Sequence, residues 1–453
     1  MKLSFLGATE TVTGSKYLLQ EDDTHYLIDC GLFQGHKELR ERNWHPLPIK
    51  ASKIKAVLLT HAHLDHSGYL PLLVKNGFRG PIYASHGTRD LCEIILRDSG
   101  HIQEEDAKFA NRHGYTKHKP ALPLYTKEDV EMTLKRFHTV PFDKELPLRK
   151  GFTFKLTHSG HLVGSAFITL KNEHTTLVFS GDVGRLNDAI MRPPERIPFA
   201  DYLVLESTYG DRLHPKGDIS AHLAEVINTT IAKGGSIVIP AFAVGRSQTV
   251  LYDIYKLKQE KRIPGNIPVY LDSPMAENAA PLLCKYANEH SLAEGVCSTF
   301  SSSAEYLRTP EDSKKINTLT TPCIIISASG MAEGGRVLHH IKHYAPDPKN
   351  TILFSGFQAG GTRGARMLNG EPEVKIHGEL VPIKARVERL TELSSHADYE
   401  ELLIWLRGFE SPPKEVFITH GEPTAAEALK EKIQRAFGWN VTVPHYLDTF
   451  DLP

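Results

Sequence analysis

Three histidines and an aspartate fall within six residues in the segment Thr60–His66. They are His61, His63, Asp65 and His66. Imidazole and carboxylate groups together are the donors that zinc and similar divalent ions prefer. His61 and His63 are two positions apart, so both can converge on one ion from a turn. Asp65 and His66 must then point to a neighbouring position, and the spacing predicts two metal ions rather than one.

Two simpler explanations of this segment are a polar loop with several histidines by chance and a structural zinc site. Chance explains the grouping poorly, because the histidines directly follow Ala56–Thr60, an apolar run that predicts a buried strand. Structural zinc sites are usually closed, four-ligand and rich in cysteine, and no cysteine lies near this segment in the sequence. The residues therefore predict a catalytic metal site at the carboxyl end of a strand.

The elements that must position such a site are strands with a reactive residue where they end. Four predicted strands end in a reactive residue: the one in His25–Gly31 ends at Asp29, the one in Thr176–Gly184 at Asp182, the one in Asp201–Gly210 at Glu206, and the one in Glu415–Glu422 at His420. Further strands are predicted at Lys2–Leu6, Phe152–Thr157 and Ala166–Leu170, and helices at 89–109 and 422–437. Taken by itself, Asp29 is better explained as the cap of a turn. His158 and His161 compete for one position in a glycine-flanked loop, and the spacing to the next strand favours His161. Asp182, between two glycines, is the natural carboxylate to bridge two cations.

The stretch His61-x-His63-x-Asp65-His66 resembles the signature of the metallo-β-lactamase fold superfamily. Leu27–Gly31, the loop of His161 and the strand end at Asp182 are similar to its other motifs, in the same order. The resemblance implies seven ligands for two zinc ions, and manganese could occupy the same positions. The ligands would be His61, His63 and His161 for the first ion, Asp65, His66 and His420 for the second, and Asp182 between both. It also implies that Asp29 supports the metal loop.

Three further stretches resemble motifs A, B and C of the β-CASP group, the nucleic-acid-processing branch of this superfamily. They are Glu206–Gly210, Leu393–Asp398 and the strand end at His420. The resemblance spans essentially the whole chain and is to the compact bacterial β-CASP ribonucleases, relatives of the endonuclease subunit of the cleavage and polyadenylation specificity factor. It implies an α/β protein, a four-layer αββα sandwich with an inserted α/β β-CASP domain. The expected boundaries are 1–208 and 385–453 for the first domain and 209–384 for the insertion.

Strand and helix patterns alternate through the expected insertion, so its sheet should be mainly parallel. Helices are predicted at Ala221–Ala232 and from Ala241 to about Lys258, and strands at Gly235–Pro240, Pro268–Asp272 and Cys323–Ser327. Val381–Leu390 is predicted to return to the first domain as a strand. Glycine-rich segments follow two strands, and they could serve tight turns alone or, as the resemblance favours, contact phosphates. The candidates for phosphate contact are Arg246, Arg336, Arg363, Ser394 and Ser395.

The resemblance implies a zinc-dependent ribonuclease that cuts single-stranded RNA, most naturally within the strand, through a hydroxide activated by two metal ions. His396 would protonate the departing 3′-oxygen, and Glu206 would orient His396. Asp65 counts as catalytic as well as metal-binding. The insertion would act as a lid over a groove that admits a single strand and excludes a duplex.

The composition of the chain limits where the protein can be located and what it can bind. The 453 residues carry a formal charge of -1, so contact with nucleic acid must come from local patches. The five cysteines are odd in number and lack a CxxC pair, which predicts reduced thiols, mostly in cores. The first residues predict a strand rather than a signal peptide. We expect a soluble cytoplasmic protein with no membrane partner, and a homodimer is possible.

Three other functions compete with the ribonuclease. A small-molecule thioesterase or lactonase of the same fold would lack the large insertion and the pair of Glu206 and His396. A non-catalytic RNA-binding scaffold would have lost ligands, whereas all seven ligand positions are filled here. A DNA nuclease is not separated from a ribonuclease by any residue in the sequence.

Overall fold

The computed structural model describes every residue except 115, 117, 216–218, 357 and 391–393. The chain forms two compact units, one of residues 1–213 with 396–453 and the other of residues 214–395. Among the described residues, no helix has the length and apolar character needed to cross a membrane.

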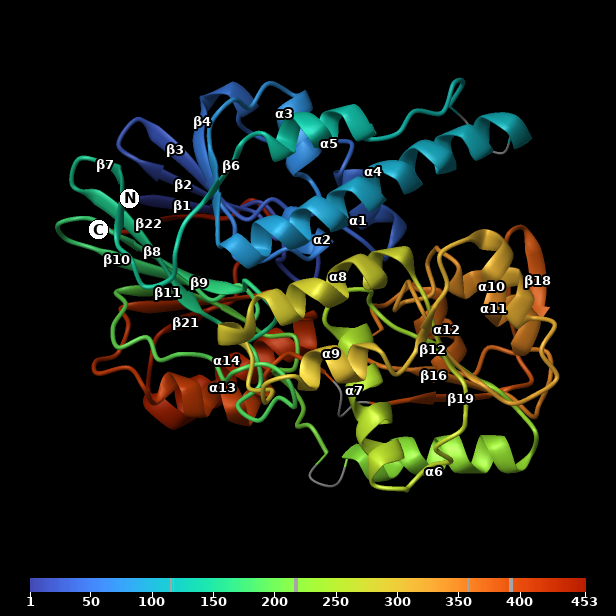
Figure 1. Cartoon of the computed structure of the whole chain (residues 1–453). Helices are drawn as coiled ribbons and strands as arrows, with labels where there is room; N and C mark the ends of the chain where they lie inside the picture. The colour runs from blue at the N-terminus through green and yellow to red at the C-terminus, as the bar shows by residue number, and fades with distance from the viewer. Residues whose placement is uncertain (115, 117, 216–218, 357, 391–393) are drawn as a thin grey trace. The chain divides into compact units, whose positions relative to one another are not determined.

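The first unit holds two seven-stranded sheets packed face to face (Figure 1). The first sheet has the order β22-β1-β2-β3-β4-β5-β6, with β22 (Thr449–Asp451), β1 (Lys2–Phe5), β2 (Tyr17–Glu21), β3 (Thr24–Ile28), β4 (Ile54–Leu58), β5 (Ile82–Ala84) and β6 (Phe137–Thr139). The second has the order β21-β20-β11-β10-β9-β8-β7, with β21 (Val441–Thr442), β20 (Glu415–Thr419), β11 (Tyr202–Glu206), β10 (Thr176–Phe179), β9 (Ala166–Lys171), β8 (Phe152–His158) and β7 (Leu146–Arg149).

Aromatic rings from the two sheets meet in the core between them. The ring of Phe5 lies 5.3 Å from that of Phe417, and the ring of Tyr17 lies 5.5 Å from that of Phe179. Burial of such large rings is among the strongest favourable contributions to folding. The two sheets are therefore held as one sandwich, and the loops at the ends of their strands keep fixed positions relative to each other.

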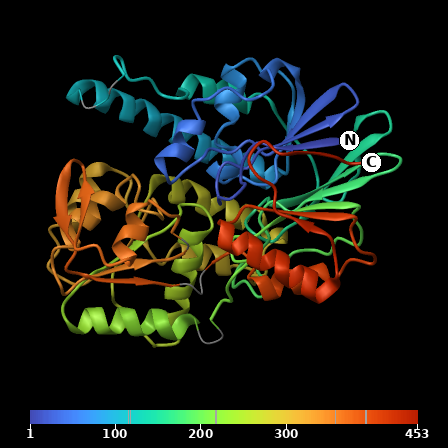
Figure 2. The same cartoon turned by 180° about the vertical axis from the view of Figure 1, so that it is seen from behind.

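Helices cover both outer faces of this sandwich, as Figures 1 and 2 show from opposite sides. The helices on the side of the first sheet are α1 (Lys37–Arg42), α2 (Leu64–Ser67), α3 (Leu70–Lys75), α4 (His86–His113) and α5 (Lys127–Leu134). Those on the second sheet are α13 (Tyr399–Leu406) and α14 (Pro423–Phe437), whose Trp405 and Leu429 pack with Leu203 and Leu205 of β11. The expected four-layer αββα sandwich is confirmed.

The second unit is built on a six-stranded sheet in which every adjacent pair is parallel. Its order is β14-β13-β15-β12-β16-β19, with β14 (Glu305–Tyr306), β13 (Val269–Asp272), β15 (Ile324–Ser327), β12 (Ile237–Pro240), β16 (Thr351–Phe354) and β19 (Arg386–Arg389). Its helices are α6 (Ile219–Ala232), α7 (Arg246–Gln259), α8 (Pro274–Lys285), α9 (Val296–Ser301), α10 (Pro310–Ile316), α11 (Val337–Tyr344) and α12 (Arg363–Leu368). The hairpin β17 (Glu373–Ile376) and β18 (Glu379–Pro382) completes it. The predicted parallel sheet is confirmed.

Two expectations about this unit are wrong. Val381–Leu390 does not return to the first domain as one strand. It divides into β18 and β19, and β19 pairs with β16 inside the second unit, so the chain leaves this unit only after residue 395. The cysteines are not all reduced, because Cys284 of α8 and Cys297 of α9 form a disulfide with their Cα atoms 5.6 Å apart. The packing of these two helices, which no sequence spacing reveals, brings the pair together.

The first unit contains a buried lysine whose amine lies between a backbone carbonyl group and two aromatic rings. Lys16 is 1% exposed, and its Nζ donates to the backbone oxygen of Gly14 at 3.1 Å. Nζ also lies 4.2 Å from the centre of the Phe33 ring and 5.0 Å from that of Tyr69. Burial is the main cause that lowers the pKa of Lys16 to about 8 from 10.5. A charged amine is therefore costly at this position.

The stability of the protein should reflect this lysine between pH 8 and pH 10.5. In that window the unfolded chain keeps a proton that the folded lysine has lost, so the contribution of Lys16 to stability rises with pH. Lys16→Met removes the charge and keeps the length. We expect the thermal midpoint of the wild type to rise relative to Lys16→Met by several degrees across the window, at about 2–4 °C per kcal/mol. A midpoint difference that is independent of pH would contradict the buried titration.

Candidate metal centre

The reactive residues of the first unit come from strand ends at neighbouring edges of its two sheets. Asp29 directly follows β3, and His61 to His66 follow the parallel strand β4 and run into α2. In the second sheet, Asp182 follows β10 and His420 follows β20, and β11 lies between these strands and is parallel to both. Parallel strands present their carboxyl ends at one edge, which is where ligands usually bind in α/β folds. The topology therefore gathers residues that are more than 350 positions apart in the chain.

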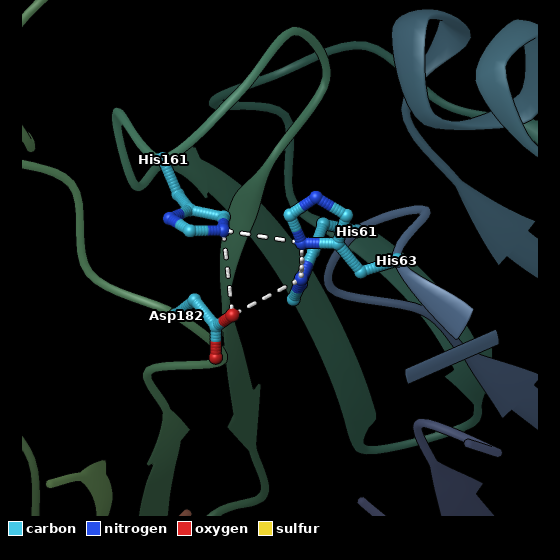
Figure 3. A group of neighbouring side chains, drawn as sticks. All are labelled: His61, His63, His161 and Asp182. Carbon is cyan, nitrogen blue, oxygen red and sulfur yellow. Dashed lines mark hydrogen bonds and ion pairs between the residues drawn. The ribbon is translucent and has the colours of Figure 1, made fainter. Parts of the chain in front are cut away.

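Four side chains form the first group of potential metal ligands, drawn in Figure 3. Nδ1 of His63 lies 3.2 Å from Nε2 of His61 and 3.3 Å from Nε2 of His161. Oδ2 of Asp182 lies 3.3 Å from the same nitrogen of His61 and 3.4 Å from that of His161. Three imidazole nitrogens and one carboxylate oxygen thus face a common point, the arrangement that a tetrahedral zinc ion requires.

Asp65, His66 and His420 form a second group beside the first. Nε2 of His420 lies 3.1 Å from Nε2 of His66 and 3.4 Å from Oδ2 of Asp65. The other carboxylate oxygen of Asp182, Oδ1, lies 3.2 Å from Nε2 of His66. Asp182 therefore turns one oxygen toward each group. Its Oδ1 is buried and accepts no hydrogen bond from the described residues, which is costly unless a cation satisfies it.

Asp29 and Thr60 fix which nitrogen of two of these histidines faces inward. Nδ1 of His66 lies 2.8 Å from Oδ2 of Asp29, and Nδ1 of His61 lies 3.0 Å from Oγ1 of Thr60, which itself donates to Asp29. Each Nδ1–H has an acceptor on the outer side, so each Nε2 lone pair points into the group. A carboxylate behind a histidine ligand usually has this role at metal sites.

The electrostatics of the two groups suit a cation. Burial lowers the pKa of His61 to about 3 and of His63 to about 4, and it lowers that of His161 strongly, so these rings are neutral donors at pH 7. Burial by itself would raise the pKa of Asp182. The charges of the surrounding histidines, of which His420 and His66 contribute most, instead hold that pKa well below the usual range. Burial likewise opposes protonation of His66, but Asp182 and Asp29 raise its pKa well above the usual value. A metal would take the place of that proton.

Glu206 and His396 form a pair at the edge of the two groups. Nδ1 of His396 lies 3.2 Å from both carboxylate oxygens of Glu206 and 3.9 Å from Oδ2 of Asp182. Glu206 is 1% exposed, and its Oε1 also accepts the backbone N–H of Val183 at 2.5 Å. Burial opposes protonation of His396, but the charges of Glu206 and Asp182 raise its pKa. The arrangement can hold an imidazolium beside the metal groups.

The structure brings together all eight residues predicted for the metal site and its support, Asp29 included, as well as the predicted acid pair. His158, the alternative to His161, lies elsewhere. Its ring stacks on that of Phe142, with centroids 3.5 Å apart. Asp65 lies on the short helix α2 rather than on a loop.

The five candidates for phosphate contact lie in the second unit. Arg336 donates to Asp272 at 2.7 Å and to the backbone oxygens of Leu307 and Arg308. Arg363 donates to the backbone oxygens of Lys375, Ala332 and Glu333. Both guanidinium groups therefore hold the chain's own loops together. Arg246 is nearly buried, with its NH2 group 3.4 Å from Oγ of Ser395, and Ser394 is buried, while Leu393 of the same motif lies outside the described residues.

Sequence reasoning missed three hydroxyl groups that contact the site. Oγ of Ser15 lies 3.3 Å from Nε2 of His66, Oγ1 of Thr60 lies 3.0 Å from Nδ1 of His61, and Oγ1 of Thr208 lies 3.1 Å from Nδ1 of His420. Thr60 directly precedes the predicted ligand His61, and Thr208 follows Glu206 of the predicted acid pair by two residues. That adjacency is the only signal in the sequence, because serine and threonine are common at strand ends for other reasons.

The fold and these residues define a metal-dependent hydrolase of the metallo-β-lactamase fold. Three family models match the chain: the Beta-lactamase superfamily domain over residues 24–240, the Beta-Casp domain over 247–367, and the Zn-dependent metallo-hydrolase RNA specificity domain over 380–444. Ribonuclease TTHA0252 of Thermus thermophilus is 38% identical over 95% of this chain and 95% of its own length. Transcription termination factor FttA of Methanocaldococcus jannaschii is 30% identical over 99% of this chain and 71% of its own.

A solved structure of a protein of unknown function from Enterococcus faecalis is also similar. The match covers 100% of this chain and 99% of that protein's chain, with a TM-score of 0.53 and 13% sequence identity. This likeness concerns the fold alone. The family models and the two relatives show that the chain belongs to the β-CASP ribonuclease family of zinc-dependent metallo-hydrolases.

Proposed function

We propose that this protein cleaves single-stranded RNA by hydrolysis of its phosphodiester bonds, with two zinc ions, for which manganese could substitute. The observation that carries the proposal is the position of Asp182, with one oxygen toward each group of ligands and an acid pair alongside. When bound there, two ions lower the pKa of a water molecule and offset the negative charge of a phosphodiester. RNA as the substrate is supported by the name of the ribonuclease relative and of the RNA specificity domain.

In this proposal the seven predicted residues divide into two ligand sets that share Asp182. His61, His63 and His161 would hold one ion, and Asp65, His66 and His420 the other. Neutral imidazoles and carboxylates are the donor set of catalytic zinc sites. Asp29 keeps the ring of His66 in place from behind.

His396 would donate the proton that the departing 3′-oxygen needs. Its Nδ1 lies 3.2 Å from both carboxylate oxygens of Glu206, and Nε2 would be the nitrogen that donates to the substrate. Glu206 favours the protonated ring and orients it. All five phosphate-contact candidates stay in the proposal: Arg246, Ser394, Ser395, Arg336 and Arg363. The last two also donate to loops of their own unit.

The test compares four substrates under one condition: 5′-labelled single-stranded RNA, the same RNA as a duplex, single-stranded DNA and a thioester. We expect cleavage of single-stranded RNA, with internal products that carry 5′-phosphate and 3′-hydroxyl ends. If DNA were cleaved in preference to RNA, the protein would be a DNA nuclease rather than a ribonuclease. Turnover of the thioester alone would favour the small-molecule hydrolase.

Removal of metal should abolish this activity and weaken the fold of the first unit. Dialysis against a chelator would leave the buried carboxylate of Asp182 and the imidazole nitrogens around it without the cation that offsets them. We expect loss of cleavage, a lower thermal midpoint, and recovery of both on addition of two zinc equivalents per chain. Recovery with one equivalent would contradict two ions. Unchanged cleavage after complete removal, measured by elemental analysis, would contradict metal-dependent chemistry.

A further inference from the structure

Thr208 lies two residues beyond Glu206, at the point where β11 has ended, and its side chain reaches both halves of the site. It is 4% exposed. Its Oγ1 lies 2.6 Å from Oε2 of Glu206 and 3.1 Å from Nδ1 of His420. None of the expectations from sequence gave this residue a role. It connects the carboxylate of the acid pair to one of the candidate metal ligands.

The direction of these two hydrogen bonds follows from the chemistry of a hydroxyl group. Threonine has one hydrogen to donate and lone pairs with which to accept. A carboxylate can only accept, and the contact to Glu206 is the shorter one, so the hydroxyl hydrogen goes to Glu206. The hydroxyl oxygen then accepts from Nδ1–H of His420. The backbone oxygen of His420, 3.2 Å away, is a weaker alternative acceptor for the same hydrogen.

This assignment determines the tautomer of His420. With the hydrogen on Nδ1, the lone pair is on Nε2, the nitrogen that lies close to His66 and Asp65 in the second ligand group. Oδ1 of Asp182, 3.5 Å from Nδ1, is the other group on that side, and its distance exceeds that to Thr208. An acceptor behind a histidine ligand is a recurrent feature of metal sites.

The same hydroxyl also anchors the acid pair. Oε2 of Glu206 receives the hydroxyl hydrogen of Thr208 at 2.6 Å and the backbone N–H of Thr208 at 3.3 Å, and it faces Nδ1 of His396 at 3.2 Å. A continuous chain therefore runs from His420 through Thr208 and Glu206 to His396. Every member has a donor or acceptor of the required kind.

We propose that Thr208 is a positioning residue that orients His420 toward the second metal ion and Glu206 toward His396 at the same time. The inference rests on the proposed function for its effect on cleavage, but its effect on metal binding does not. The hydroxyl is the necessary group, and the methyl group is not. Serine should therefore replace threonine with little loss, and valine, which has nearly the same shape, should not.

The test compares Thr208→Val and Thr208→Ser with wild type, with Thr419→Val as the matched control. Thr419 is also buried and adjoins His420, but its hydroxyl pairs with that of Tyr17, 3.0 Å away. Each metal-free protein is titrated with zinc against a chromophoric chelator. We expect the affinity for the second ion to fall about 10–100-fold in Thr208→Val only, and the first ion to bind as in wild type.

Cleavage of RNA is the second readout. For zinc-saturated Thr208→Val we expect kcat about tenfold lower with KM unchanged, because RNA binding does not use the hydroxyl, and near-wild-type kcat for Thr208→Ser. Equal zinc affinity in Thr208→Val and Thr419→Val would overturn the proposal, as would failure of serine to restore it. If wild type cleaves no RNA, the proposed function fails, and the zinc titration still decides the role of Thr208.

Discussion

His396→Ala is expected to lower kcat for RNA by about 10²–10⁴-fold while both metal ions stay bound. The ring of His396 belongs to neither of the two ligand groups but clusters with Asp182 and Glu206, and its Nδ1 lies 3.2 Å from Glu206. In the proposed mechanism, loss of the ring removes the proton donor and leaves the seven proposed ligands in place. The measurement is single-turnover cleavage of labelled RNA, with metal content determined by elemental analysis on the same sample.

His158→Ala is the matched control for this variant. His158 was the alternative to His161 as a ligand, and its ring packs on Phe142 outside the metal groups. We expect wild-type zinc content and activity from it. If His396→Ala lost zinc, its ring would have to be counted among the ligands, and if it cleaved RNA like wild type, the leaving oxygen would take its proton elsewhere.

The metal groups could be predicted from sequence because three of the ligands, His61, Asp182 and His420, lie just beyond strands with a clear apolar pattern. Such a strand fixes the position of the residue that follows it, so His61, Asp182 and His420 meet once the strands pair. The short spacing from His61 to His66 limits the loop to few conformations. The resemblance to a family added the pairing of Glu206 with His396, which no local pattern contains.

Contacts with phosphate are harder to predict from the sequence than the metal groups are. Arg336 and Arg363 follow glycine-rich loops, as a phosphate-binding arginine would, and the sequence cannot tell which acceptor a long side chain will find. In the structure Asp272 and several backbone oxygens engage them. Buried carbonyl groups of the protein need hydrogen-bond donors, and they compete with a bound phosphate for the same arginine. The role of an arginine therefore depends on tertiary contacts.

The wrong or missing predictions all concern packing between segments that are distant in the sequence. Cys284 and Cys297 pair because α8 and α9 place them side by side. The strand expected to return to the first domain pairs instead with β16, because the apolar surface it completes belongs to the second unit. Thr208 was overlooked because its two partners, Glu206 and His420, are far apart in the chain. Local patterns predict elements well and predict contacts between elements poorly.

Asp182→Asn is expected to lose metal as well as activity. The substitution keeps the shape of the side chain, but it removes the negative charge of a carboxylate that faces both ligand groups and replaces one oxygen with an N–H₂ group. Asp182 is 2% exposed, so solvent cannot compensate for the lost charge. We expect fewer than two zinc ions per chain at micromolar free zinc and a fall in kcat of at least about a thousandfold.

Asp188→Asn, the same change in the loop that follows, is its control. Oδ1 of Asp188 accepts two backbone N–H groups, which an asparagine oxygen can also do, so zinc content and activity should stay at wild-type values. Retention of two tightly bound ions in Asp182→Asn would show that the bridge is dispensable and would leave the two ligand groups independent. Together with His396→Ala, the variant separates two losses that a cleavage assay alone cannot distinguish. His396→Ala would remove the proposed proton donor from an intact metal centre, and Asp182→Asn would remove the carboxylate proposed to hold both ions.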